Sequence, residues 1–239
     1  MVARTRKIVL FLLLLFLLST GVFVFLHSPG FYLSAFDVSG HRQLTEDEVI
    51  QLSGLLYGEH LMVAFDNTVR DAITASPWVA DARVRMSYPG TVVITIRERT
   101  PVALLILPGS GFYLVDARGF LLAEKSGPGG DWMIITGMSH SDMARDDRPA
   151  SYRLTTALRV AQRAQDVSLS LPVQEVHVNQ QGEVELFMAA GVRALLGTIG
   201  ADLGHLLQVL ETVLVALGDE ARSVDYVDLR FERPVVQKR

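Results

Sequence analysis

Hydrophobic positions are most concentrated near the start of the chain. Residues 8–26 carry no charge, and Ser19 and Thr20 are their only polar side chains. As a helix rising about 1.5 Å per residue, this run is about 28 Å long, close to the roughly 30 Å hydrocarbon core of a bilayer. Because only a helix satisfies its own backbone hydrogen bonds in lipid, the pattern predicts a transmembrane helix over residues 8–26.

A cleaved signal peptide is the alternative interpretation of this run. Ser19, Thr20 and Gly21 are small residues of the kind found at cleavage sites. Signal cores span only about 7–15 residues, whereas residues 22–26 continue the apolar run past this point. The length therefore favours an uncleaved membrane anchor.

The flanking charges orient the predicted anchor. Residues 1–7 contain Arg4, Arg6 and Lys7 and no acidic residue. Since basic segments stay on the cytoplasmic side, residues 1–7 are expected to form a cytoplasmic tail, with residues 27–239 across the membrane. The chain is thus predicted to be a single-pass protein of the inner (plasma) membrane with its bulk in the periplasm or its equivalent.

Short periodic segments predict a small α+β domain over residues 31–99. Its first strand covers residues 31–39. Thr45 and Glu48 then have the spacing of a capping box, which begins a short helix that Gly54 ends.

A second helix and a hairpin complete this domain. Asp66 is the expected N-cap of the helix, and Pro77 prevents its continuation. The predicted apolar face of this helix comprises Val69, Ala72 and Ile73. Residues 78–88 and 92–97 alternate between apolar and polar side chains on either side of a Pro-Gly turn, as in a β-hairpin.

After Thr100 and Pro101 the pattern becomes richer in strands. Two helices interrupt them at residues 154–165 and 203–217, and the second carries a continuous leucine and valine stripe. The other expected strands before residue 224 cover residues 102–107, 112–115, 120–123, 133–136, 173–178 and 183–188.

The last long strand is expected over residues 224–231. Its inward side chains would be Val227, Leu229 and Phe231. Its outward side chains would be Tyr226, Asp228, Arg230 and Glu232. Pro234 follows, and residues 235–236 are expected to form one more short edge strand.

Composition narrows the classes of function. The chain has 22 basic and 26 acidic residues, and without the three basic residues of the tail the exported part has 19 against 26, a net charge of −7. This balance argues against nucleic acid or anionic lipid as the main partner. The chain contains no cysteine, which excludes disulfides and thiolate chemistry and fits a bacterial envelope.

The sequence contains no recognised catalytic or metal-binding pattern. It has no G-x-S-x-G elbow, no H-E-x-x-H and no P-loop. Its histidines fall at no metal-ligand spacing; they are His27, His41, His60, His140, His177 and His205. We therefore predict no catalytic residue, no cofactor, no metal and no small-molecule substrate, so the protein is not expected to be an enzyme.

Six short motifs occur along the chain, and the ordered series identifies a family more specifically than any single motif does. The most specific is Glu98-Arg99-Thr100-Pro101-Val102-Ala103, of the form E-R-x-P-V-A. The others, in chain order, are Phe36-Asp37-Val38-Ser39-Gly40, Ser76-Pro77-Trp78-Val79 with Ala82-Arg83-Val84, Tyr88-Pro89 with Val93-Ile94-Thr95-Ile96, Leu114-Val115-Asp116 with Gly119, and Tyr226-Val227-Asp228-Leu229-Arg230. Behind a predicted spanning helix, this series resembles the bacterial cell division family FtsQ, called DivIB in Gram-positive bacteria.

The resemblance implies a fold and a role. It implies a POTRA domain over residues 27–99 and the family's β domain over residues 100–239. It also implies a non-enzymatic scaffold, enriched at the division septum, that binds the divisome membrane proteins FtsB and FtsL and helps localise and regulate septal peptidoglycan synthesis.

A POTRA-containing protein of an outer-membrane assembly or secretion system is the alternative. Such domains usually precede a long barrel of alternating strands. Here only about 140 residues follow, and two predicted soluble-type helices interrupt them. The pattern therefore favours the division scaffold.

The candidate partner-binding residues lie at the end of the β domain; they are Tyr226, Arg230, Phe231, Glu232 and Arg233. An edge strand exposes unpaired backbone groups to which a partner segment can add itself as a further strand. The resemblance indicates the same place, because it implies that FtsB binds the terminal strands in this way. The alternative is that Arg230 and Glu232 are an ordinary solvated face and that Phe231 packs inside.

The junction between the two predicted domains carries a second hypothesis. Pro101 fixes its own backbone and biases Thr100 toward extended geometry, which predicts a stiff joint. The charges of Glu98 and Arg99 are expected to hold the relative angle of the domains.

Overall fold

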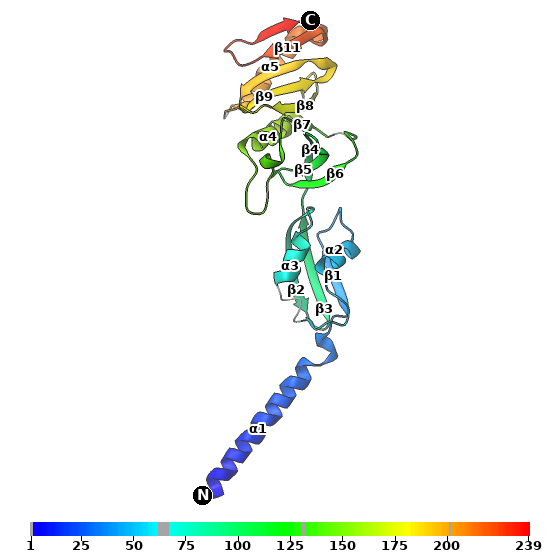
Figure 1. Cartoon of the computed structure of the whole chain (residues 1–239), viewed down its shortest axis with the longest axis vertical. Coiled ribbons are helices and arrows are strands. Elements are labelled where there is room, and N and C mark those ends of the chain that lie inside the picture. The colour runs from blue at the N-terminus through cyan, green and yellow to red at the C-terminus, as the bar shows by residue number, and fades with distance from the viewer. Residues whose placement is uncertain (1, 62–66, 131, 201) are drawn as a thin grey trace. The chain divides into compact units, whose positions relative to one another are not determined.

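Two compact units, which divide between Glu98 and Arg99, make up the chain (Figure 1). The computed structural model describes residues 2–61, 67–130, 132–200 and 202–239. Within the first helix it describes the side chains of residues 6 and 9–25.

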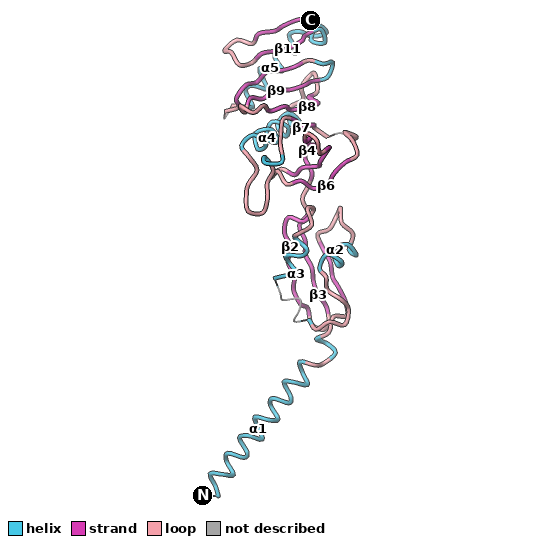
Figure 2. Tube along the Cα trace, in the orientation of Figure 1, coloured by secondary structure: helices cyan, strands magenta, loops and turns pink. Residues whose placement is uncertain are grey.

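The apolar run at the start of the chain is helical. α1 extends over Val2–Leu26 and so includes all of residues 8–26 (Figure 2). Within the part of the chain that the structure describes, no helix has both the length and the apolar character needed to cross a membrane. The membrane anchor of residues 8–26 stays a prediction.

The rest of the first unit has the predicted order of strand, helix, helix, strand, strand. Its three-stranded sheet has the order β1-β3-β2, with β1 parallel and β2 antiparallel to β3. The elements are β1 (Ala35–Ser39), α2 (Glu46–Ser53), α3 (Asn67–Thr74), β2 (Val79–Ser87) and β3 (Thr91–Glu98).

Apolar periodicity and a cap explain these elements. Thr45 Oγ1 accepts a hydrogen bond from the Glu48 N–H, and Glu48 in turn accepts from the Thr45 N–H, so the predicted capping box is formed. Gly54 ends α2 with a φ of 69°, a left-handed conformation that glycine adopts without strain. The buried side chains of this unit form one core, which includes Val49, Ile73, Ala82, Ile94 and Ile96.

Two expectations for this unit differ from the structure, and a third falls on a residue that the structure does not describe. The first strand begins at Ala35 rather than at residue 31, because Pro29–Phe31 form a 3₁₀ turn and Leu33 bonds to the backbone of Glu59. Ala72 is exposed, although it was expected on the apolar face of its helix. Asp66, the expected N-cap of that helix, lies outside the described residues.

The second unit is built on a nine-stranded sheet in the described residues. Its order is β12-β11-β10-β9-β8-β7-β4-β5-β6, with β7 parallel to both of its neighbours and β10 parallel to β11. The elements are β4 (Pro101–Leu107), β5 (Gly111–Asp116), β6 (Leu121–Lys125), β7 (Ile134–Thr136), α4 (Tyr152–Asp166), β8 (Val173–Val178), β9 (Glu183–Met188), β10 (Arg193–Thr198), α5 (Leu203–Leu217), β11 (Val224–Asp228) and β12 (Val235–Lys238).

Both long helices of this unit contribute to the core of the sheet. The predicted stripe of α5 buries Leu203, Leu207, Leu210 and Leu214 in the same cluster as apolar side chains of β8 to β11. The α+β class expected from the sequence is confirmed, and β10 is a strand that the sequence analysis missed.

Candidate partner-binding site

The sheet of the second unit ends in a strand with one unpaired side. Among the residues that the structure describes, β12 pairs with β11 alone, in the register Val227 to Val236 and Asp228 to Val235, and it is the outermost strand (red in Figure 1). The N–H and C=O groups on its outer side are therefore available for pairing with another chain. The short edge strand expected at residues 235–236 is confirmed and is longer, and the expected strand over residues 224–231 is the next-to-last one.

The strand β11 is shorter than predicted because its last residue, Asp228, is buried and bound by Arg230. We call this pair of residues the clamp. Asp228 was expected to point outward, but its side chain is only 6% exposed, and the guanidinium of Arg230 covers it. Asp228 Oδ1 accepts from the Arg230 N–H at 3.0 Å and from Nε at 2.9 Å, and Oδ2 accepts from Nη2 at 2.7 Å. This local turn ends the strand at Asp228.

The clamp also fixes the ionisation of its two groups. The side-chain hydrogen bond from Arg230 is the main cause that holds the pKa of Asp228 below its usual value. The same bond raises the pKa of Arg230 above its ordinary value. The aliphatic part of Arg230 packs over Gly197, where an added Cβ would lie 2.9 Å from the arginine Cγ. Arg230 is thus a structural residue as well as a candidate contact.

The five predicted contact residues do not share one environment. Tyr226 is half-buried on β11, opposite Arg193 and Gln237, and the guanidinium of Arg193 lies 5.8 Å from its ring centroid. Phe231 was expected to face inward within a strand, but it is 62% exposed in the loop after β11. Glu232 and Arg233 are exposed in the same loop, so Phe231, Glu232 and Arg233 form one accessible segment beside β12.

Sequence reasoning missed the strand that ties this edge to the rest of the sheet. On β10, Arg193 forms ion pairs with Glu185 of β9 at 3.4 Å and with Asp225 of β11 at 3.1 Å. The alternation of Val192, Ala194 and Leu196 is the signal that predicts this strand, since all three side chains are buried.

The end of β12 is fastened by charged side chains. Lys238 Nζ donates to Glu220 at 2.6 Å, and this bond is the main cause that lowers the pKa of Glu220. Arg239 donates to the carbonyl oxygens of Ala190 and Gly191 at 2.9 and 2.8 Å. The edge strand is therefore held at its far end while its outer side remains unpaired.

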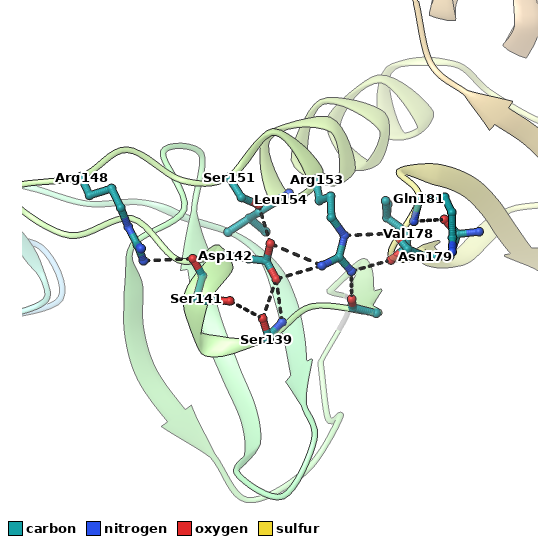
Figure 3. Close-up of polar contacts among 11 residues, drawn as sticks. Ser139, Ser141, Asp142, Arg148, Ser151, Arg153, Leu154, Val178, Asn179 and Gln181 are labelled. Carbon is teal, nitrogen blue, oxygen red and sulfur yellow. Dashed lines mark hydrogen bonds and ion pairs between the residues drawn. The ribbon is translucent and has the colours of Figure 1, made fainter.

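A second polar cluster lies away from this edge, and Figure 3 shows its contacts. The carboxylate of Asp142 accepts from the N–H and hydroxyl of Ser139, from the Ser151 hydroxyl at 2.6 Å and from Arg153 Nη1 at 3.2 Å. Burial alone would raise the pKa of Asp142, but the bonds from Ser151 and Ser139 and the charge of Arg153 together hold it below its usual value.

The same cluster connects three segments of the second unit. Arg153 donates to the carbonyl oxygens of Gly137, Val178 and Asn179, and Ser151 Oγ accepts from the Leu154 N–H as the N-cap of α4. The two Asp142 oxygens are both occupied by these donors. We interpret the cluster as the fastening of the loop before α4, and it takes no part in the candidate site.

The junction residues are each fastened within their own unit. The carboxylate of Glu98 accepts from the backbone N–H groups of Arg42, Gln43 and Leu44 at 2.8 to 2.9 Å. Burial opposes the ionisation of Glu98, but these three donors and the nearby His41 lower its pKa on balance.

Arg99 is held just as firmly in the second unit. Its guanidinium pairs with Asp116 at 3.0 Å and lies 3.6 Å from the ring centroid of Phe120. The hypothesis that Glu98 and Arg99 set an angle between the domains stays a prediction.

Among the described residues, no group of three or more His, Cys, Asp or Glu side chains is arranged to hold a metal ion.

A pocket of about 210 Å³ lies beside the clamp, between Arg230 and the sheet. Its lining includes His177, Glu183, Glu185 and Leu195.

Two comparisons with known proteins bear on this arrangement. Residues 31–99 match the POTRA domain, FtsQ-type, and residues 104–230 match the C-terminal domain of cell division protein FtsQ/DivIB. The chain belongs to the FtsQ/DivIB family. The resemblance predicted from the six motifs is therefore confirmed, and β12 lies beyond the matched part of the C-terminal domain.

Individual relatives cover most of the chain. It is 28% identical to the cell division protein FtsQ of Geobacter sp. (strain M21) over 87% of this chain and 76% of that protein. It is 30% identical to FtsQ of Anaeromyxobacter sp. (strain K) over 81% of this chain and 66% of that protein. It is 32% identical to the cell division protein DivIB of Brevibacillus brevis over 50% of this chain and 45% of that protein.

Proposed function

We propose that the chain is a non-enzymatic scaffold of the bacterial division machinery, with a POTRA domain in residues 27–99 and a partner-binding β domain in residues 100–239. Membership of the FtsQ/DivIB family supports the role in division. The observation that carries partner binding is the outer side of β12, which no strand among the described residues pairs with. The proposal assigns no catalytic residue, cofactor, metal or nucleic acid to the chain.

The proposed partner is a segment of FtsB, which acts together with FtsL. The segment adds to β12 as a further strand, so that backbone hydrogen bonds supply affinity. Phe231, Glu232 and Arg233 beside the strand, with Tyr226 and the exposed face of Arg230, supply selectivity. Aromatic and arginine side chains are frequent strong contributors at interfaces, where losing one can cost about 2 kcal/mol or more.

A binding measurement with one matched control tests this proposal. Phe231→Lys should abolish or strongly weaken binding of the chain to an FtsB peptide, because it removes the most exposed aromatic contact. Val215→Lys is the control, since Val215 is also 62% exposed but belongs to α5 and not to the segment of residues 231–233. Full binding by a folded Phe231→Lys protein would refute the assigned surface.

We also propose that residues 8–26 anchor the chain in the inner membrane with the N-terminus in the cytoplasm, and that the protein is concentrated at the septum. The uncharged run and the basic tail support the anchor. A C-terminal phosphatase that is active only after export should be active in this fusion. A mature chain that begins near Val22 would contradict the anchor.

A further inference from the structure

In the first unit, the hairpin turn between β2 and β3 is hydrogen-bonded to the segment that directly follows α1. α1 ends at Leu26, and Gly30 accepts a hydrogen bond from the Gly90 N–H at 2.8 Å. Gly90, between β2 and β3, in turn accepts from the N–H groups of Ser34 and Ala35 at 2.7 and 3.1 Å. Four residues of chain reach at most about 14 Å, so this turn stays within that distance of the helix end.

Aromatic and apolar side chains gather at this end of the unit. The ring of Tyr88 lies over Gly30, where an added Cβ would meet it at 2.7 Å, and its centroid is 5.5 Å from that of Phe31. Phe31 also stacks with His60 at 6.1 Å, and Tyr32 meets His60 edge-on at 5.5 Å.

The loop before His60 adds two exposed side chains to this group. Gly58 donates its N–H to Leu33 and Glu59 accepts from the Leu33 N–H, which holds the loop against the chain that follows α1. Leu56 and Tyr57 are each 66% exposed and Tyr88 is 63% exposed. We call Phe31, Tyr32, Leu56, Tyr57, His60 and Tyr88 the aromatic end.

Both the side-chain types and their position fit a lipid interface. Tyrosine has an apolar ring and a polar hydroxyl, and such residues are enriched where headgroups meet the hydrocarbon. The opposite end of the same sheet, eight residues along β3, carries Glu98 and the exposed Arg42 and is about 25 Å away. The exposed apolar side chains are thus concentrated at the end next to α1.

We propose that the aromatic end lies in the headgroup layer of the membrane, so that lipid covers Leu56, Tyr57 and Tyr88. This inference rests on the proposed anchor in residues 8–26. The attraction is apolar, since the exported part carries a net negative charge and is not drawn to anionic lipid. The unit would then be seated on the bilayer in addition to being tethered to it.

The absence of cysteine from the chain permits a direct test. The full chain is reconstituted in vesicles of phosphatidylethanolamine and phosphatidylglycerol, with one nitroxide label at Leu56→Cys or Tyr88→Cys. Collisions of the label with oxygen and with a water-soluble nickel chelate report its depth. Arg42→Cys is the control at the opposite end of the sheet, and Leu14→Cys reports on the anchor.

The four labels separate the inference from the anchor on which it rests. We expect the labels at 56 and 88 to shift from the aqueous value of the label at 42 toward the value of the label at 14. Aqueous values at 56 and 88 with a buried label at 14 would overturn the inference and leave the anchor intact, which is also the result expected if another protein covers this end. An aqueous value at 14 would overturn both.

Discussion

Two turns of the second unit share the pattern Asp-x-Arg but pair their aspartates differently. Asp116-Ala117-Arg118 begins at the last residue of β5, and Asp228-Leu229-Arg230 begins at the last residue of β11. In both, a buried aspartate accepts the backbone N–H two residues later, at 2.9 Å in the first turn and 3.0 Å in the second. The turn itself is thus a local property of an aspartate at a strand end.

The source of the compensating guanidinium distinguishes the two turns. Asp116 is paired with Arg99 from the start of β4, and the two side chains are 7% and 8% exposed. Asp228 is paired with Arg230 from its own turn, and that arginine is 44% exposed. The remote pair, Arg99 with Asp116, is therefore buried on both sides. The local pair, Arg230 with Asp228, leaves a charged guanidinium at the surface beside β12.

Removing the remote guanidinium should have the largest effect on stability. Arg99→Ala leaves the buried Asp116 without its counter-charge, which costs about 3–5 kcal/mol of the free energy of unfolding for a buried pair. Urea unfolding of the exported part measures the loss. Arg118→Ala is the control, because this exposed arginine also faces Phe120 but does not pair with Asp116 through its side chain. Equal losses in both variants would contradict the distinction.

Replacing Asp142, the third buried aspartate of this unit, should cause the second-largest loss of stability, and this loss should depend on pH. Asp142→Asn places an amide N–H₂ group, which cannot accept hydrogen bonds, against the donors of Ser139, Ser151 and Arg153. We therefore expect the free energy of unfolding to fall by about 3 kcal/mol at pH 7. Asp146→Asn, an exposed residue of the same loop, should change little.

The sign of the pH effect follows from the lowered pKa of Asp142, in which burial is outweighed by its hydrogen bonds and Arg153. A carboxyl group of this kind contributes its full stability above the unfolded pKa, about 3.9, and loses it as the pH falls through the lower folded value. The difference between the wild type and Asp142→Asn should therefore shrink below about pH 4. A constant difference down to pH 2 would show that the carboxylate charge is not what stabilises the loop.

The local pair should give a smaller loss of stability and a loss of binding. Arg230→Ala removes two side-chain donors from Asp228, but water reaches this half-exposed site and replaces part of the interaction. We expect a melting temperature between those of the wild type and Arg99→Ala, together with weaker binding of the FtsB peptide. Arg233→Ala, in the same loop without a role in the clamp, separates the effect of charge from that of the turn.

Phe231→Lys should have the smallest effect on folding and the clearest effect on binding. Phe231 is exposed, so its replacement is expected to change the free energy of unfolding by less than about 0.5 kcal/mol. Loss of peptide binding at an unchanged melting temperature would assign Phe231 to the partner surface. A lowered melting temperature would instead indicate that the ring supports the edge strand.

Much of the fold was predictable because local patterns agree with it. The capping box at Thr45, the alternating hairpin and the leucine stripe of α5 all form as expected, since each depends on neighbours within a few residues. The strand β10 was missed because its alternating apolar residues are few and lie between the short turn Ala189–Gly191 and a loop. Local periodicity gives little signal for such a short segment.

The candidate site was only partly predictable. Alternation alone placed Asp228 outward and Phe231 inward, and both placements are wrong. Period-two counting holds while a strand continues, but the bonds from Arg230 to Asp228 stop the strand, and the residues beyond it no longer alternate. The remote partners of buried charges, such as Arg99 for Asp116, cannot be assigned from spacing, because the sheet order decides which strands meet.

The position of β12 in the chain determines when the edge of the sheet can form during synthesis. β12 is the last strand of its sheet to be synthesised, at about 5–20 residues per second, and the strands before it leave the ribosome first. Until residues 235–238 have been added, the outer side of β11 is the boundary of the sheet. A chain cut short before Val235 would therefore end its sheet at β11 and would lack the strand to which the partner segment is proposed to add.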